Sequence, residues 1–175
     1  MSIDRIAHIL DATGDEYRYF SASTAPTPAE LTQLERQVGR TLPPDYTAFI
    51  LRWGVLIFDV DEATWRRPAA YEVRPQWQMH YARFVHGMDA SAAPEFRLLD
   101  ARNAFARIDP HFLPILRSPM SREVEGYDAY NRWVCWNGSG FVATPHASFV
   151  DAVVASFQQL IADRERLRVE PIAPA

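Results

Sequence analysis

Three carboxylates that lie close together in the chain, Asp59, Asp61 and Glu62, are the residues whose types and spacing best suit chemistry. Such a group could bind a metal ion or supply the acid and base of an enzyme. It could also meet a basic surface on a partner protein, where opposite charges speed association and set specificity. The third alternative is a solvated polar loop. Because no other catalytic pattern accompanies these carboxylates, the sequence favours the loop first, then the partner contact, and the enzyme last.

The other reactive side chains do not form a catalytic or metal-binding pattern. The chain has no cysteine pair, no two histidines at metal-ligand spacing, no Gly-rich phosphate loop and no G-x-S-x-G elbow. The single cysteine, Cys135, lies between Val134 and Trp136 in a predicted strand, which indicates a buried structural thiol rather than a nucleophile. Structural or surface roles are also favoured for the five histidines, which are His8, His80, His86, His111 and His146. We therefore expect no enzyme activity, no bound metal and no cofactor.

Aromatic residues follow the carboxylates along the chain. Trp65 precedes two arginines and Trp77 lies between two glutamines, and such polar surroundings are typical of exposed side chains. Trp, Tyr and Arg dominate the hot spots of protein interfaces, where truncation costs about 2 kcal/mol or more. The sequence thus predicts a partner-binding surface that consists of Asp59, Asp61, Glu62, Trp65, Tyr71 and Trp77. Packing of the two tryptophans over the edge of a sheet is the alternative interpretation.

Composition and charge limit the class of protein. The 175 residues, 48% of them hydrophobic, suit one globular domain, and we expect it to span residues 1–168 with a flexible tail at 169–175. The net charge of −4 is uneven, because residues 1–62 hold ten acidic and five basic residues. We expect this acidic half to attract a basic partner if its charges share a face, and no basic cluster predicts direct nucleic-acid binding. The absence of a signal-peptide pattern and of an apolar run of about 20 residues indicates a cytoplasmic protein without a membrane partner.

Hydrophobic periodicity predicts helices first, then short strands, then a long helix. This order indicates an α+β fold with a central, mostly antiparallel sheet flanked by helices. The predicted helices cover residues 2–13, 27–39, 43–54, 100–108 and 148–168. In the fourth of them, Asp100 is the expected N-cap, and Ala104, Phe105 and Ile108 are expected to face inward. The predicted strands cover residues 17–20, 55–58, 70–74, 83–87, 96–99, 112–116, 123–127, 132–136 and 141–144. Asn137 and Gly138 predict a hairpin with a type I′ turn between the last two strands.

Residues 27–54 form the most informative segment. Thr27 and Glu30 are spaced for a capping box, Pro28 suits a first helical turn, and Gly39 can end that helix. A Leu-Pro-Pro connection then opens a second helix that Gly54 can stop. The apolar residues recur at helical spacing and should be mostly buried; they are Leu31, Leu34, Val38, Leu42, Tyr46, Phe49, Ile50 and Trp53. The segment is therefore predicted to be scaffold.

This segment resembles the SUKH superfamily, the Smi/Knr-type proteins. The matching positions are Glu35, Gly39, Leu42, Pro43, Tyr46, Phe49, Trp53 and Gly54. The family usually has Asn before the last Gly, where this chain has Trp53. The resemblance is weaker in residues 113–115, in Tyr127 and Asp128 followed by residues 132–136, and in the Ser148-Phe149 pair that opens the last helix.

The resemblance implies a SUKH-like single domain without enzymatic activity. Bacterial members of the family typically bind a toxin used in competition between cells and block its active site or its folding surface. The implied partner is therefore a cognate toxin, such as a nuclease or another enzyme that acts in the cytoplasm, and the acidic first half of the chain predicts that this toxin is basic. The alternative that we retain is a cytoplasmic adaptor or regulatory scaffold without a toxin partner, like the fungal relative that regulates cell-wall synthesis.

Overall fold

The computed structural model describes residues 2–60, 82–89, 91–118 and 121–169, without the side chains of residues 166–169, and the statements below concern these residues. Five helices and seven strands are described. They are α1 (Asp4–Ala12), β1 (Tyr17–Ser21), α2 (Pro28–Val38), α3 (Pro44–Trp53), β2 (Leu56–Val60), β3 (Arg83–Val85), α4 (Leu98–Phe105), β4 (Leu113–Arg117), β5 (Val124–Tyr127), β6 (Trp133–Trp136), β7 (Phe141–Ala143) and α5 (Phe149–Val169), with a 3-10 turn at Pro94–Phe96.

The predicted helix pair forms with its predicted ends. The Thr27 hydroxyl accepts a hydrogen bond from the Glu30 N–H, and the Glu30 carboxylate accepts one from the Thr27 N–H, which completes the capping box. Helix α2 ends at Gly39, whose φ of 80° lies in the left-handed region that favours glycine. Helix α3 begins at Pro44 and ends at Gly54. Every apolar residue predicted to be buried in this pair is at most 8% exposed, so the predicted burial is confirmed for them.

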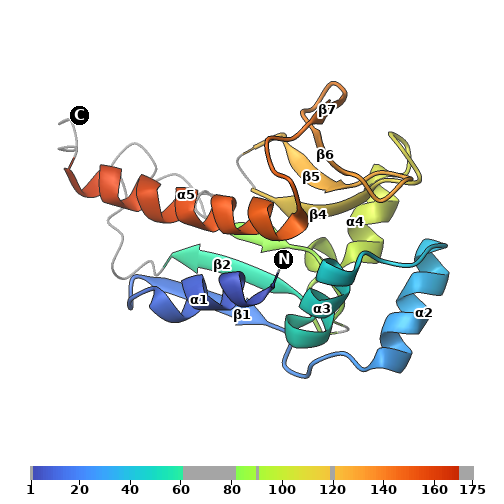
Figure 1. The fold of residues 1–175 in the computed structure, drawn as a ribbon, viewed down its shortest axis with the longest axis horizontal. Helices are drawn as coiled ribbons and strands as arrows, with labels where there is room; N and C mark the ends of the chain where they lie inside the picture. The colour runs from blue at the N-terminus through green and yellow to red at the C-terminus, as the bar shows by residue number, and fades with distance from the viewer. Residues whose placement is uncertain (1, 61–81, 90, 119–120, 170–175) are drawn as a thin grey trace.

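The strands form one antiparallel sheet in the order in which they follow one another along the chain (Figure 1). Each strand is hydrogen-bonded to the next, from β1 at one edge to β7 at the other. Strands β4 to β7 follow one another through short connections, which suffice to reverse the chain, whereas α2 and α3 lie between β1 and β2 and α4 lies between β3 and β4. The predicted α+β fold with an antiparallel sheet is therefore confirmed, and the fold is a single domain.

The core lies between the sheet and helices α1, α3 and α5. Helix α5 runs along α1 (Figure 1), and an ion pair of 2.6 Å between Arg5 and Asp151 joins these two helices at the surface. Tyr46 and Phe49 of α3 pack on Phe149 of α5 with ring centroids 5.3 and 5.4 Å apart. Farther along α5, Phe157 packs on Phe58 of β2 at 4.6 Å. These aromatic contacts join the helix pair, the final helix and the sheet in one hydrophobic cluster.

Two expectations about the middle of the chain are wrong. The segment 96–99 is not a strand, because a 3-10 turn ends at Phe96 and α4 already begins at Leu98. Asp100 is consequently not the N-cap; its carboxylate lies in the first turn, 2.7 Å from the Arg97 guanidinium. The buried residue of this helix is Leu98 in its first turn. Of the residues expected to face inward, Ala104 and Ile108 are exposed, whereas Phe105 is half-buried and packs on Phe112 with ring centroids 5.4 Å apart.

The hairpin between β6 and β7 forms, but its turn differs from the predicted type. A type I′ turn needs positive φ at two successive residues, and in the loop 137–140 only Gly138 has a positive φ, at 92°. The Asn137 side chain instead accepts hydrogen bonds from the N–H groups of Ser139 and Gly140, each at 3.0 Å. Asparagine thus stabilises the loop with its side chain rather than with its backbone conformation.

Candidate protein-binding surface

Of the six residues predicted to bind a partner, the structure describes one. Asp59 lies in β2, where its carboxylate accepts a hydrogen bond from the Val60 N–H and lies 3.7 Å from the guanidinium of Arg18 on β1. The other five predicted residues lie outside the described part of the chain; they are Asp61, Glu62, Trp65, Tyr71 and Trp77. The predicted strand at 70–74 lies outside it as well.

Most described carboxylates of the acidic first half are already engaged. Three of them form ion pairs, Asp4 with Arg52 at 2.9 Å, Glu16 with Arg164 at 3.3 Å and Asp59 with Arg18 at 3.7 Å. Three others accept hydrogen bonds within the scaffold, and these are Glu30, Glu35 and Asp45. Paired charges attract a distant partner less than free ones, because each pair presents little net charge. The prediction of a basic partner stays a prediction.

The family-like residues of the helix pair have structural roles. The Glu35 carboxylate accepts a hydrogen bond of 2.8 Å from the Leu42 N–H and so holds the turn between α2 and α3. The Tyr46 hydroxyl is fully buried and donates a hydrogen bond of 2.7 Å to the carbonyl of His86. Burial raises the pKa of Tyr46 well above its ordinary value, so it remains a neutral donor. Gly54 is held close to Ala22 and Met88, where a Cβ atom would lie 2.6 Å from each.

A tightly built loop follows β5. The Asp128 carboxylate accepts hydrogen bonds from the N–H groups of Tyr130 and Arg132 and from the Arg132 guanidinium, at 2.6 to 2.9 Å. Partial burial acts to raise the pKa of Asp128, but the backbone and side-chain hydrogen bonds from Arg132 and the one from Tyr130 together hold it below its usual value. Asn131 adopts a φ of 58°, which Asn tolerates better than most residues. The loop 128–132 is therefore closed around one ionised carboxylate.

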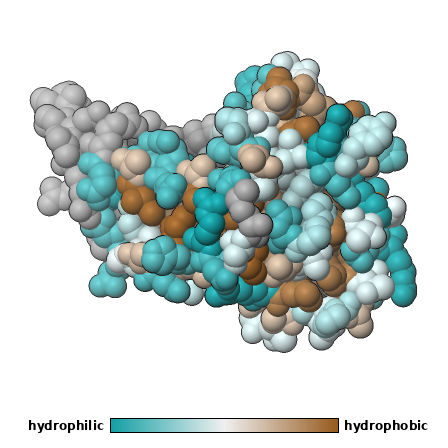
Figure 2. All heavy atoms as spheres, in the orientation of Figure 1, coloured by the Kyte–Doolittle hydropathy of each residue, from teal (hydrophilic) through white to brown (hydrophobic). Residues whose placement is uncertain are grey.

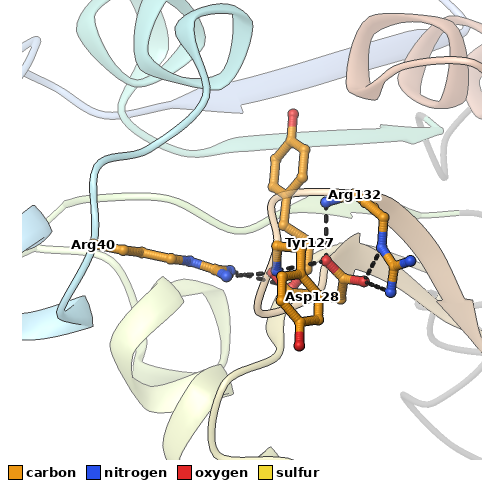
Figure 3. A network of polar contacts seen from close by, with 5 residues as sticks. Arg40, Tyr127, Asp128 and Arg132 are labelled. Atoms are coloured by element: carbon orange, nitrogen blue, oxygen red, sulfur yellow. Dashed lines mark hydrogen bonds and ion pairs between the residues drawn. The ribbon is translucent and has the colours of Figure 1, made fainter.

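Arg40 attaches this loop to the helix pair. Its guanidinium donates to the carbonyls of Tyr127 and Asp128 (Figure 3), so the turn after α2 supports the start of the loop. The Tyr127 hydroxyl also donates to Asp45 of α3 at 3.1 Å. Loss of solvent lowers the pKa of Arg40 from its usual value, yet a guanidinium does not lose its proton in a protein. The permanently charged guanidinium of Arg40 thus fixes the position of the loop.

The loop displays its outer residues beside an open recess. Tyr130 is 80% exposed, and the Arg132 guanidinium lies 5.1 Å from the centroid of its ring. The recess has a volume of about 510 Å³, and strand β7 forms its opposite side with Phe141 and Val142, which are 39% and 43% exposed. Figure 2 shows hydrophobic side chains at the surface over the β6–β7 hairpin. Hydrophobic and aromatic side chains next to an exposed Arg are the composition of an interface hot spot.

The sequence did not single out this surface as a partner site. Arg40 and Tyr130 carry no motif, and nothing local relates residue 40 to residue 128. A signal does exist in the sequence: residues 133–150 contain no Asp, Glu or Arg, which is unusual for strands that reach the edge of a sheet. The family resemblance includes Tyr127 and Asp128 of the same region, but it predicted them as part of the fold and not as a binding surface.

The buried side chains of His86 and Cys135 are both uncharged at pH 7. His86 is 2% exposed, and its Nδ1 lies 2.9 Å from the carbonyl of Pro114. Burial lowers the pKa of His86 to about 4, so it is neutral at pH 7. Cys135 is buried as predicted, and burial raises the pKa of its thiol to about 11. Among the described residues no group of three or more His, Cys, Asp or Glu side chains is arranged to hold a metal ion.

No family model matches the chain, and no curated protein matches it. Within the described residues, no helix is long and apolar enough to cross a membrane.

Proposed function

We propose that the protein is a SUKH-type immunity protein, which binds a cognate bacterial toxin domain and neutralises it by masking its active site. The sequence motif in residues 27–54 supports the family assignment, and the motif residues serve as scaffold in the structure. The fold is α+β with an antiparallel sheet and a closing helix, which agrees with what the resemblance implies. Inhibition by masking needs a rigid contact surface and no chemistry of its own.

The observation that carries this proposal is the display of Tyr130 and Arg132 on a loop fixed from three sides. Asp128 closes the loop, Arg40 holds its carbonyls, and Asp45 accepts the hydroxyl of the preceding Tyr127. Side chains that are already ordered lose less conformational entropy on binding, which increases affinity. The exposed apolar residues of β7 lie directly beside them.

The partner proposed here is a toxin that acts in the cytoplasm, where the immunity protein would also be found. A nuclease or another enzyme would fit, and the acidic first half of the chain is the reason to expect a basic one. The residues of segment 59–77 that were predicted from the sequence remain candidates for a second contact area, because five of the six lie outside the described residues.

Co-expression with the product of the gene directly upstream tests the proposal. We expect the two proteins to co-purify in a 1:1 complex and the toxin activity of the partner to disappear in that complex. Calorimetry on the separated proteins should give the nanomolar to micromolar affinity that is common for protein interfaces of standard size. If the upstream product has no toxic activity and does not bind, the immunity function is wrong.

The same experiment distinguishes an immunity protein from the retained alternative, an adaptor or regulatory scaffold. An adaptor or regulatory scaffold would use the same kind of preorganised surface, but its partner would have no toxic activity that binding could suppress. A stable complex with a non-toxic upstream product would therefore support the adaptor.

A further inference from the structure

The two edges of the sheet differ in how they are protected. Edge strands offer unpaired N–H and C=O groups to other chains, and proteins commonly block them with charged residues, prolines or bulges. Strand β1 carries such a charge, because Arg18 pairs with Asp59 and lies 5.7 Å from the ring centroid of Phe20. Strand β7 consists of Phe141, Val142 and an alanine, all exposed, and is paired only with β6 among the described strands.

The chemistry of a strand edge that no other described strand covers indicates what can pair with it. Alternate residues of an antiparallel edge direct their N–H and C=O groups outward, and only another extended backbone can pair with this row. Strand addition of this kind draws affinity from the main chain and specificity from pockets for alternate side chains. The recess of about 510 Å³ lies beside β7 and can receive such side chains.

Arg132 supplies the hydrogen-bond donors that select the partner segment. Its Nε and one terminal nitrogen contact the Asp128 carboxylate at 2.6 Å, whereas the remaining terminal nitrogen points away from it (Figure 3). The side chain is 70% exposed, so these outer N–H groups can meet a second carboxylate in the paired geometry that guanidinium favours.

Two further guanidinium groups, those of Arg40 and Arg102, lie behind the loop. Arg40 and Arg102 donate to backbone carbonyls rather than to carboxylates, so these hydrogen bonds leave their charges uncancelled. The carboxylates that line the recess are Asp109 and Asp128, and Asp128 is already paired with Arg132. Asp45 and Glu125 lie nearby as well, where they accept hydrogen bonds from Tyr127 and from Trp133 and Thr144. These groups together give no excess of positive charge, so it is the outer N–H groups of Arg132 that suit an acidic residue.

We propose that β7 and the loop 128–132 bind an extended segment of a partner protein, which adds to β7 as an eighth strand and places an Asp or Glu side chain on Arg132. This inference rests on the proposed protein-binding function and names the segment of the partner that is recognised. The requirement is local and holds for a partner of any net charge.

A random dodecapeptide library displayed on phage, selected against the immobilised protein, provides a probe that does not depend on knowing the partner. We expect the enriched peptides to share an alternating apolar pattern with Asp or Glu at a fixed position. Synthetic versions should bind Val142→Lys and Arg132→Gln about tenfold more weakly or worse than the unmodified protein. The matched control is Tyr19→Lys, which changes an exposed aromatic residue, 46% exposed, on the opposite edge strand and should leave binding unchanged.

The variants are chosen to keep the fold. Val142 is largely exposed, and lysine is the residue that edge strands commonly carry. In Arg132→Gln the Asp128 carboxylate still accepts the backbone N–H groups of residues 130 and 132, so the loop keeps its closure. Thermal unfolding of each variant checks this directly.

The outcomes separate this inference from the immunity function. Failure to enrich peptides, enrichment without an acidic position, or equal losses with Tyr19→Lys would overturn strand addition at β7. If the upstream product binds Val142→Lys and Arg132→Gln as tightly as the unmodified protein, strand addition is wrong while the immunity function stands. If acidic peptides bind at β7 but the upstream product does not bind at all, strand addition stands and the immunity function is wrong.

Discussion

Replacement of Arg40 by alanine should weaken the junction between the helix pair and the loop that displays Tyr130 and Arg132. The change leaves the carbonyls of Tyr127 and Asp128 without their charged donor. Hydrogen bonds from charged groups contribute about 1.5–3 kcal/mol each, but Arg40 is only half-buried, so water replaces part of the loss. We expect unfolding to become easier by about 2 kcal/mol for both bonds together. In a domain of this size that corresponds to a decrease of about 4–8 °C in Tm.

Urea unfolding followed by tryptophan fluorescence measures this loss, and hydrogen exchange reports where it occurs. The amides of residues 128–132 should exchange faster in Arg40→Ala, while those of α5 change only with global stability. Arg36→Ala is the matched control, because Arg36 is exposed on α2 and no hydrogen bond or ion pair to another described residue is found for it. A loss below about 0.5 kcal/mol in Arg40→Ala, or an equal loss in Arg36→Ala, would refute the role assigned to Arg40.

Three further predictions concern the interior. Burial lowers the pKa of His86 to about 4 from 6.5, so the unfolded state binds the proton first, and stability present above pH 6.5 should fall by about 3 kcal/mol as the pH drops to 4. Urea titrations should show this pH-dependent loss, and a His86→Gln variant with an equally steep loss would contradict it. Gly87→Ala should destabilise by more than about 3 kcal/mol, since its Cβ would lie 1.7 Å from the Gly54 oxygen, whereas Gly14→Ala meets no atom within 4 Å and should be neutral in the same assay. Cys135 should react with a disulfide reagent at pH 8 only after unfolding, since burial raises the pKa of its thiol to about 11; rapid reaction of the native protein would show that the thiol is accessible.

Local signals were sufficient to predict most of the fold. The capping box of Thr27 and Glu30 and the terminating Gly39 are short-range interactions, and the structure contains them as predicted. Alternation and turn residues located the late strands to within one or two positions. The prediction of a strand at residues 96–99 was wrong because the apolar residues of this segment suit either a strand or the start of a helix. The tertiary contacts of Leu98 decide between the two.

The candidate surface could not be predicted in the same way, because it depends on contacts between distant parts of the chain. Arg40 meets Asp128 across 88 positions, and no periodic pattern relates the two residues. The sequence instead directed attention to the carboxylates that include Asp59, which in the structure is paired with Arg18. A count of acidic residues does not say which of them are already neutralised by a neighbour, and that requires the fold.

These contacts distinguish the residues that support the fold from those that form the candidate surface. Residues at the family-like positions, such as Glu35 and Tyr46, already use their polar groups in hydrogen bonds to the turn after α2 and to the carbonyl of His86. Few of these groups are therefore available to a partner. Arg40 lies in that same turn, and its hydrogen bonds hold in place the loop that carries Tyr130 and Arg132. Under the proposed function, substitutions in the outer loop would change which partner segment binds without affecting the fold, whereas a substitution at Arg40 would change both. A binding surface that must discriminate between related partners benefits from this arrangement, because specificity can change while the supporting contacts remain.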